Sequence, residues 1–212
     1  MFRNLAGTAA LALSLGLTAP LASASVIQVS SPGALSQGPY TVDNFESGPT
    51  GSASYSAASG IVWAPAGGYA SGGTPSGAYG ISTNSFPDPI TITFPYAVSS
   101  MGLWFGNDDP CCSGGFTANL DLYDGATLVA TLPQVANMND FADQFIGFNT
   151  TAGETFTSAT IRYGSGTDVS LYTYIDDVYF NRASAIPEPA SMFLLATGLM
   201  GLAVITRRSR KG

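Results

Sequence analysis

Short runs of alternating apolar and polar residues fill the chain between residues 25 and 186, where the helical period is absent. In the clearest run, residues 90–94, the side chains of Ile90, Ile92 and Phe94 face one side of a strand. Glycine, proline, asparagine and aspartate separate the runs, as is typical of strands joined by turns. The candidate strands are residues 41–45, 60–63, 78–81, 90–94, 101–105, 120–123, 127–132, 145–148, 159–163 and 171–180.

Eight to ten short strands in one domain imply two packed sheets. We therefore expect an all-β fold, an antiparallel β-sandwich of the jelly-roll type, over residues 25–182. Asp124 and Gly125 separate two of the runs and predict a hairpin turn. Residues 47–59 and 64–77 are rich in glycine, serine and alanine, so we expect long loops or weak edge strands there.

The apolar run at residues 190–206 contains no charged side chain. As a helix, it spans about 26 Å at roughly 1.5 Å per residue, close to the thickness of a bilayer core. Residues 207–212 form a basic tail, which places the C-terminus in the cytoplasm and residues 25–182 outside the membrane. The basic residues that stop the span are Arg207, Arg208, Arg210 and Lys211.

The linker at residues 183–189 ends in Pro187, Glu188 and Pro189, just before this span. The two prolines favour an extended backbone, which leaves an accessible strip at the membrane surface. The motif, the span and the basic tail together resemble the PEP-CTERM sorting signal of Gram-negative bacteria. The resemblance implies processing by the membrane enzyme exosortase, then a place at the cell surface or in the extracellular matrix. It also implies a link to exopolysaccharide and biofilm formation; a plain membrane anchor is the alternative.

The first 24 residues have the three parts of a secretory signal peptide. Arg3 supplies the positive charge, residues 5–17 the apolar stretch, and residues 22–24 an Ala-Ser-Ala cleavage site. We therefore expect an exported protein that begins at Ser25 after cleavage.

Charge is distributed unevenly along the chain. Residues 25–186 contain thirteen acidic side chains but only two basic ones, Arg162 and Arg182, for a net charge near −11. Such a surface repels nucleic acid and acidic polysaccharides unless cations intervene, and divalent cations are its natural partners. The chain contains no histidine, which excludes histidine-dependent triads and histidine metal sites.

Acidic residues occur near both ends of the expected sandwich, in strands that are commonly neighbours in a jelly roll. Phe45 and Glu46 near the start, with Asp176 and Asp177 near the end, are similar to a pattern in galactose-binding-like carbohydrate-binding modules. The resemblance implies a structural calcium ion held by Glu46 and by one of the two aspartates, since alternation turns only one of them inward. The alternative is that these side chains are solvated charges at strand ends.

Two tryptophans, Trp63 and Trp104, are candidates for stacking on a sugar ring. Trp104 lies between Leu103 and Phe105, so simple burial in the core is the stronger expectation for it. The adjacent Cys111 and Cys112 belong to an exported protein and so to an oxidising setting. They either form a disulfide with each other, pair between molecules, or remain thiols.

No nucleophile motif, phosphate-binding loop or cysteine–histidine arrangement is found in the sequence. We therefore expect a non-enzymatic protein of the cell envelope or extracellular matrix. The alternatives are a carbohydrate-binding module, with calcium as a possible stabiliser, and an enzyme acting on polysaccharide.

Overall fold

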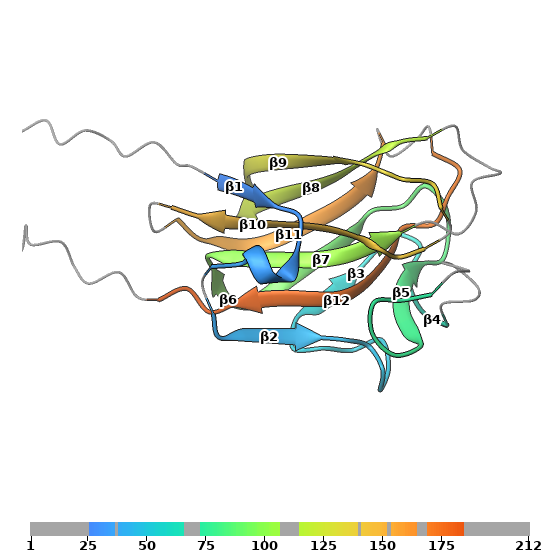
Figure 1. Cartoon of the computed structure of the whole chain (residues 1–212), viewed down its shortest axis with the longest axis horizontal. Helices are drawn as coiled ribbons and strands as arrows, with labels where there is room; N and C mark the ends of the chain where they lie inside the picture. Colours follow the sequence, from blue (N-terminus) through green and yellow to red (C-terminus); the bar gives the residue numbers. More distant parts are fainter. Residues whose placement is uncertain are drawn as a thin grey trace, which may run out of the picture.

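The computed structural model describes residues 26–36, 38–65, 73–106, 115–139, 141–151, 154–164 and 169–184. These residues form twelve strands and one short 3-10 helix, η1 (Pro32–Ala34). The strands make two antiparallel sheets that pack face to face, which confirms the expected all-β sandwich (Figure 1). The described chain begins and ends at the same end of the sandwich, on the left in Figure 1.

The larger sheet contains seven strands. Its order is β1-β10-β7-β12-β5-β4, and β2 also pairs with β12. The bounds are β1 (Val26–Val29), β10 (Gln144–Thr150), β7 (Ser100–Gly106), β12 (Tyr174–Asn181), β5 (Tyr79–Thr83), β4 (Ile61–Pro65) and β2 (Tyr40–Asp43).

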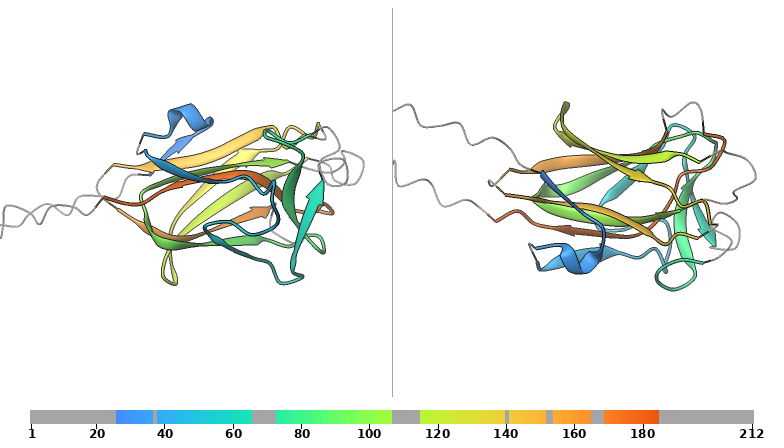
Figure 2. Two further views of the ribbon diagram at one scale, coloured as in Figure 1. Left: turned by 90° about the horizontal axis from the view of Figure 1, so that it is seen from below. Right: turned by 45° about the horizontal axis from the view of Figure 1, so that its top comes forward.

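The smaller sheet contains five strands in the order β3-β6-β11-β8-β9. The bounds are β3 (Ser54–Ser56), β6 (Ile90–Val98), β11 (Phe156–Tyr163), β8 (Thr117–Asp124) and β9 (Thr127–Val135). The second view in Figure 2 shows the space between the sheets, which apolar side chains fill. That core includes Ile92, Phe94 and Leu120 from the smaller sheet, with Leu103 and Phe148 from the larger one.

The strand predictions are confirmed with small changes at the ends. β6 keeps Ile90 and Ile92 fully buried and leaves Thr93 exposed, as alternation requires. The β8–β9 hairpin turns at Gly125, whose φ of 57° suits glycine. The expected strand at residues 171–180 is shorter at its start, because β12 begins at Tyr174. Sequence reasoning missed β1, and β3 is a weak edge strand of three residues within the glycine-rich segment.

The signal peptide, Cys111 and Cys112, the Pro187–Pro189 motif and residues 190–212 lie outside the described residues. Within the described ranges, no helix has the length and apolar character needed to cross a membrane.

β12 occupies a special position in the larger sheet. One edge pairs with β7 along most of its length, while the other edge is shared by two strands. Tyr174 and Ile175 pair with β5, and Val178 to Asn181 pair with β2. This confirms that the strand leading to Phe45 and Glu46 lies beside the last strand, β12. The two aspartates of β12 sit where its neighbour changes from one strand to the other.

Candidate functional site

A β-bulge in β12 brings two aspartates to the same side of the sheet. The register with β7 shifts between Asp176 and Tyr179, and Asp177 has a φ of 43°. Ile175 and Val178 belong to the core, so both aspartates between them face away from it. The expectation that alternation turns only one of them inward is therefore wrong, because the bulge breaks the alternation.

Glu46 comes to the same place from the turn after β2. With Asp176 and Asp177 it forms what we term the acidic cluster, since its charge acts on both aspartates. The Glu46 Oε1 accepts hydrogen bonds from the backbone N–H groups of Ala78 and Tyr79, at 3.0 and 2.9 Å. Glu46 therefore holds the start of β5 in place.

The aspartates bind an earlier residue of the loop at residues 73–79, which leads into β5. The Ser76 hydroxyl donates to Asp177 Oδ1 at 2.7 Å, and the Ser76 backbone N–H bonds the Asp176 carboxylate. Tyr179 extends the network, because its side chain hydrogen-bonds both Asp177 and Trp104. All three carboxylates of the cluster thus have partners in the loop at residues 73–79 or next to it.

One oxygen of the cluster has no partner. Asp176 is fully buried, its Oδ1 accepts from the Asp177 backbone at 2.7 Å, and its Oδ2 accepts no hydrogen bond. The buried hydroxyl of Tyr174 is also without a partner. Burial raises the pKa of Asp176 to about 8, and the neighbouring Asp177 carboxylate adds to the rise. Burial likewise raises the pKa of Tyr174, with Asp176 and then Glu46 adding to it.

The donor chemistry of the cluster suits a hard cation. Carboxylate oxygens are what calcium prefers, and an orphaned buried oxygen next to a second carboxylate is a place where a cation relieves both burial and repulsion. No three acidic, cysteine or histidine side chains converge within metal-binding distance in the described ranges. The predicted set of Glu46, Asp176 and Asp177 therefore shares one electrostatic neighbourhood without forming a three-carboxylate cage.

Asp43, three residues before Glu46, has a different role. Its carboxylate accepts from the Ser52 and Ala53 backbone N–H groups and from the Tyr55 hydroxyl, at 2.7, 3.0 and 2.6 Å. These bonds tie the end of β2 to β3 and to the residues just before it, so Asp43 supports the fold and lies outside the cluster.

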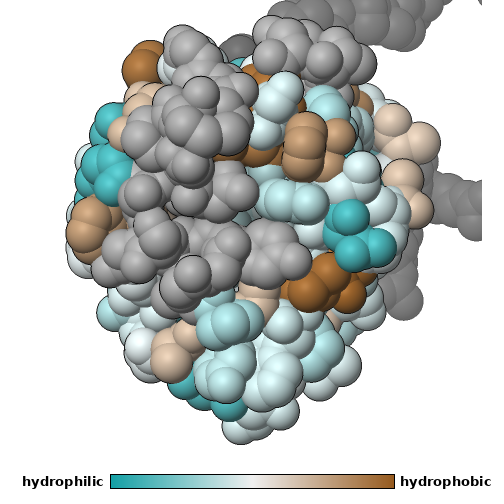
Figure 3. Space-filling view, turned by 90° about the vertical axis from the view of Figure 1, so that its right-hand side faces the viewer, coloured by the Kyte–Doolittle hydropathy of each residue, from teal (hydrophilic) through white to brown (hydrophobic). Residues whose placement is uncertain are grey.

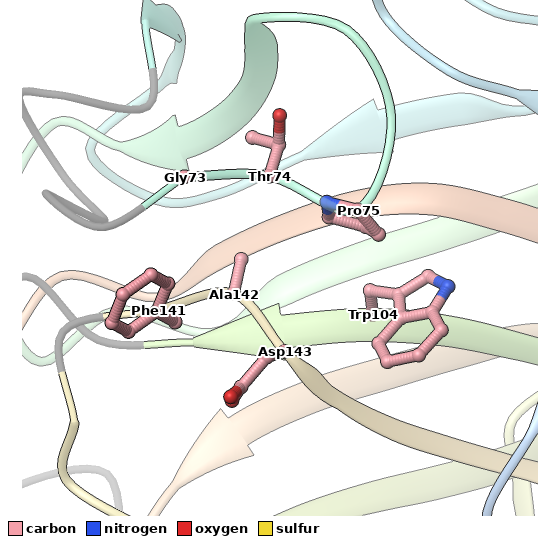
Figure 4. Close-up of a pocket in the computed structure, with 7 residues that line it drawn as sticks. All are labelled: Gly73, Thr74, Pro75, Trp104, Phe141, Ala142 and Asp143. Carbon is pink, nitrogen blue, oxygen red and sulfur yellow. The ribbon is translucent and has the colours of Figure 1, made fainter.

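A surface hollow of about 530 Å³ lies beside the acidic cluster. In Figure 4, Trp104 and Phe141 lie on opposite sides of it, with Ala142 and Asp143 between them and Gly73 to Pro75 above. Trp104 is half-buried, in contrast to the burial expected for it, because the alternating residues Met101, Leu103 and Phe105 of β7 take up the core face. The residues that line the hollow are Gly73, Thr74, Pro75, Trp104, Phe141, Ala142 and Asp143.

Hydrogen bonds fix the two loops that form the hollow. The Ala142 backbone N–H donates to the Gly73 carbonyl at 3.2 Å, which joins one loop to the other. The two oxygens of Asp143 accept from the Asn137 and Asn139 side-chain amides, both at 2.8 Å. Each oxygen retains a free lone pair, so Asp143 is an oriented acceptor beside the aromatic rings.

Trp63 lies away from this hollow, on β4. Its ring stacks on Tyr79 with centroids 4.1 Å apart, and its Nε1 donates to the Phe45 carbonyl at 2.8 Å. The side chain is 40% exposed. The structure therefore places the two candidate tryptophans in separate environments, and only Trp104 lines the hollow.

Sequence reasoning found Trp104 and missed its companions. Phe141 and Asp143 come from the segment before β10, and Thr74 and Pro75 from a glycine-rich loop, so no local pattern unites them. The one sequence signal was the aromatic side chain of Phe141 directly after two polar residues. In the structure this side chain is 43% exposed.

The C-terminal residues 185–211 match the family model of the PEP-CTERM protein-sorting motif. The match confirms the resemblance seen in the tail and marks the chain as an exported protein that exosortase processes. No curated protein matches the chain in sequence.

Several solved structures are similar to the sandwich. The CBM22-1 xylan-binding domain of Paenibacillus barcinonensis Xyn10C has 11% identity and a TM-score of 0.42, covering 68% of this chain and 94% of that chain. The K2 cleaved adhesin domain of Lys-gingipain has 12% identity and a TM-score of 0.44, covering 67% and 97%. CsCBM6-3 from Clostridium stercorarium, solved with cellobiose, has 12% identity and a TM-score of 0.37, covering 67% and 93%.

Proposed function

We propose that this protein is a non-enzymatic module of the cell surface or extracellular matrix that binds polysaccharide after exosortase has processed its tail. The hollow at Trp104 carries this proposal. Its volume lies in the range of small-ligand sites, which combine aromatic walls with a few oriented polar groups. The C–H face of a sugar ring packs against Trp104 or Phe141, while Asp143 accepts a hydrogen bond from a hydroxyl.

The position of the hollow supports the proposal. Trp104 pairs with Asp176 near the start of β12, whereas the sorting tail follows the end of β12 at Asn181. Five strand residues span roughly 17 Å, so the hollow opens toward the end of the sandwich opposite the tail. Figure 3 shows that end, where most of the coloured surface is weakly polar and carries separate strongly apolar and hydrophilic patches. A module held by its tail therefore presents this end outward.

The charges around the hollow favour an uncharged saccharide. Asp143 lines it and the acidic cluster adjoins it. Only Arg162 and Arg182 are basic between residues 25 and 186. Arg162 pairs with Asp121 on the other sheet, and Arg182 lies over the Tyr96 ring. Neither arginine lines the hollow, so no basic side chain neutralises an acidic sugar there, and we assign a neutral polymer to the hollow.

The same residues favour binding over catalysis. A glycosidase needs two carboxyl groups on either side of the bond that it cleaves, about 5–9.5 Å apart. Of the residues that line the hollow in the described part of the chain, Asp143 alone carries a carboxyl group. We therefore assign Asp143 the role of orienting a bound saccharide.

We further propose a structural calcium ion at the acidic cluster. Asp176, through its unpartnered Oδ2, and Asp177 or Glu46 would hold it, with backbone carbonyls or water completing the shell. When bound, the ion would balance the charge of buried carboxylates.

The function is tested with two polymers that share one backbone, neutral hydroxyethylcellulose and acidic carboxymethylcellulose, together with the exopolysaccharide of the producing cells. Affinity electrophoresis of the full chain in detergent measures binding, both with calcium, which would fill the acidic cluster, and in EDTA, which prevents bridging by cations. We expect a neutral polymer to bind. Trp104→Ala should weaken the affinity for that polymer at least tenfold, because the loss of one aromatic anchor costs more than about 1.4 kcal/mol of binding free energy.

Trp63→Phe is the matched control, since Trp63 lies outside the hollow and phenylalanine can preserve its stacking on Tyr79. Equal losses in the two variants would place binding elsewhere. Failure of every polymer to bind would contradict the proposed function. Comparable binding of the acidic and neutral forms would contradict the assignment of a neutral ligand.

A further inference from the structure

The acidic cluster and the hollow are neighbours on one sheet face. Asp176 pairs with Trp104 across β12 and β7, and both side chains face away from the core. Two independent groups of hydrogen bonds connect them, one through the loop at residues 73–79 and one through Tyr179. The cluster is also incomplete as it stands, since the fully buried Asp176 retains an unpartnered oxygen.

The loop forms the first connection. Thr74 and Pro75 line the hollow, and the next residue, Ser76, donates to Asp177. Gly77 follows with a φ of 57°, and a Cβ at this position would collide with the Glu46 carboxylate. In Figure 4, Pro75 lies above the Trp104 ring. The same short loop therefore contacts the cluster on one side and forms a wall of the hollow on the other.

Tyr179 forms the second connection. A tryptophan side chain can only donate and an ionised carboxylate can only accept, so the Tyr179 hydroxyl accepts from Trp104 and donates to Asp177. The orientation of the indole ring at one side of the hollow is in this way linked to the position of Asp177. Phe145 packs edge-on against Trp104 from the other side, with centroids 5.3 Å apart.

We propose that the acidic cluster positions the polysaccharide-binding hollow, with Ser76 and Tyr179 as the positioning residues that transmit its arrangement to Pro75 and Trp104. This inference rests on the proposed function for its biological meaning, but the positioning itself is a property of the hollow. Binding of a saccharide in the hollow and binding of a cation at the acidic cluster are then coupled: each changes the affinity for the other by the same factor.

The chain contains two tryptophans, so Trp63→Phe leaves Trp104 as the single tryptophan, whose emission reports on the hollow. Acrylamide quenching of the full-length Trp63→Phe chain in detergent measures how accessible the Trp104 ring is. We expect Ser76→Ala and Tyr179→Phe each to raise the quenching constant about twofold, because the loop or the ring is released from Asp177. Ser76→Thr keeps a hydroxyl at this position and should restore the parent value.

Ser56→Ala on β3 and Tyr123→Phe on β8 are matched controls on the other sheet. Circular dichroism and the urea midpoint of each variant separate a local change from general unfolding. Unchanged quenching in folded Ser76→Ala and Tyr179→Phe would overturn the inference, as would an equal rise in the controls. If polymers bind but the quenching constants do not rise, the proposed function stands and the positioning role is wrong. If the quenching constants rise but no polymer binds, the positioning role stands and the proposed function is wrong.

Discussion

Two buried aspartates on the outer faces of the two sheets have opposite surroundings. Asp121 on β8 is bound by Arg162, with 2.6 Å between Oδ2 and Nε, and by the Thr131 hydroxyl at 2.6 Å. Asp176 on β12 accepts from the Asp177 backbone N–H at Oδ1 and has no hydrogen-bond partner at Oδ2. The first pair is the one ion pair found within the described ranges, and the second site has two further carboxylates beside it.

The difference separates a structural acid from a candidate site. A buried carboxylate with a guanidinium partner has its charge balanced within the fold, and its role is complete. A buried carboxylate next to like charges has two ways to lower its energy: it binds a proton, or it binds a cation. Asp176 is in the second position.

The largest effect is expected from pH. In EDTA, Asp176 ionises near pH 4 in the unfolded chain and near pH 8 in the fold, because burial raises its pKa. Between these values the folded state keeps a proton that the unfolded state has lost. The stability from this group is therefore complete below about pH 4 and falls as the pH rises toward 8, by at most about 1.4 kcal/mol per pH unit.

Urea unfolding at pH 5, 7 and 9 measures this dependence. Asp176→Asn keeps the size of the side chain and has no proton to lose, so its stability should vary much less over the same range. Asp121→Asn is the matched control on the other sheet. A wild-type protein as stable at pH 9 as at pH 5 would show that Asp176 has a charge-balancing partner after all.

Calcium should produce the next largest effect. An ion that binds only the folded state stabilises it by about 2.7 kcal/mol at a concentration a hundred times its Kd. Thermal unfolding at pH 8, with calcium and then with EDTA, should show a clear rise in Tm for the wild type. Asp176→Asn and Glu46→Gln should lose that rise, whereas Asp121→Asn should keep it. A Tm that neither calcium nor EDTA changes would contradict the calcium proposal.

The sequence was sufficient for most strands but not for this contrast. Alternation located β6, where Ile90, Ile92 and Phe94 share the core face. The same rule failed at Asp176 and Asp177, because a bulge depends on the register with β7 and leaves no mark in the local pattern. Asp121 and Asp176 look alike in sequence, since each lies in an apolar strand. Their partners come from distant strands, and only the fold reveals them.

The hollow illustrates the same limit. Sequence reasoning singled out both tryptophans because aromatic side chains suit sugar rings, but it treated Trp104 as a core residue. Its exposure depends on the sheet face that β7 turns outward, and its surroundings depend on loops 31 residues before it and 37 residues after it, at Gly73 and Phe141. Contacts of this range follow from topology, which the order of strands in the sequence does not specify.

The smallest of the three effects should come from the balanced pair, and it tests the contrast from the other side. Arg162→Met removes the partner of Asp121 and leaves a carboxylate that is 7% exposed. Because the Arg162 side chain is itself 30% exposed, water replaces part of the interaction with Asp121, and we expect a loss of about 2 kcal/mol in the free energy of urea unfolding at pH 7.

Asp121→Asn in the Arg162→Met background removes the unpaired charge and should recover part of that loss. Such recovery would show that an unbalanced carboxylate is costly on this sheet face as well, so that Asp176 owes its distinct behaviour to the absence of a partner. An Arg162→Met variant as stable as the wild type would mean that burial alone does not make a carboxylate a site, and the acidic cluster would then depend on the proximity of Glu46 and Asp177.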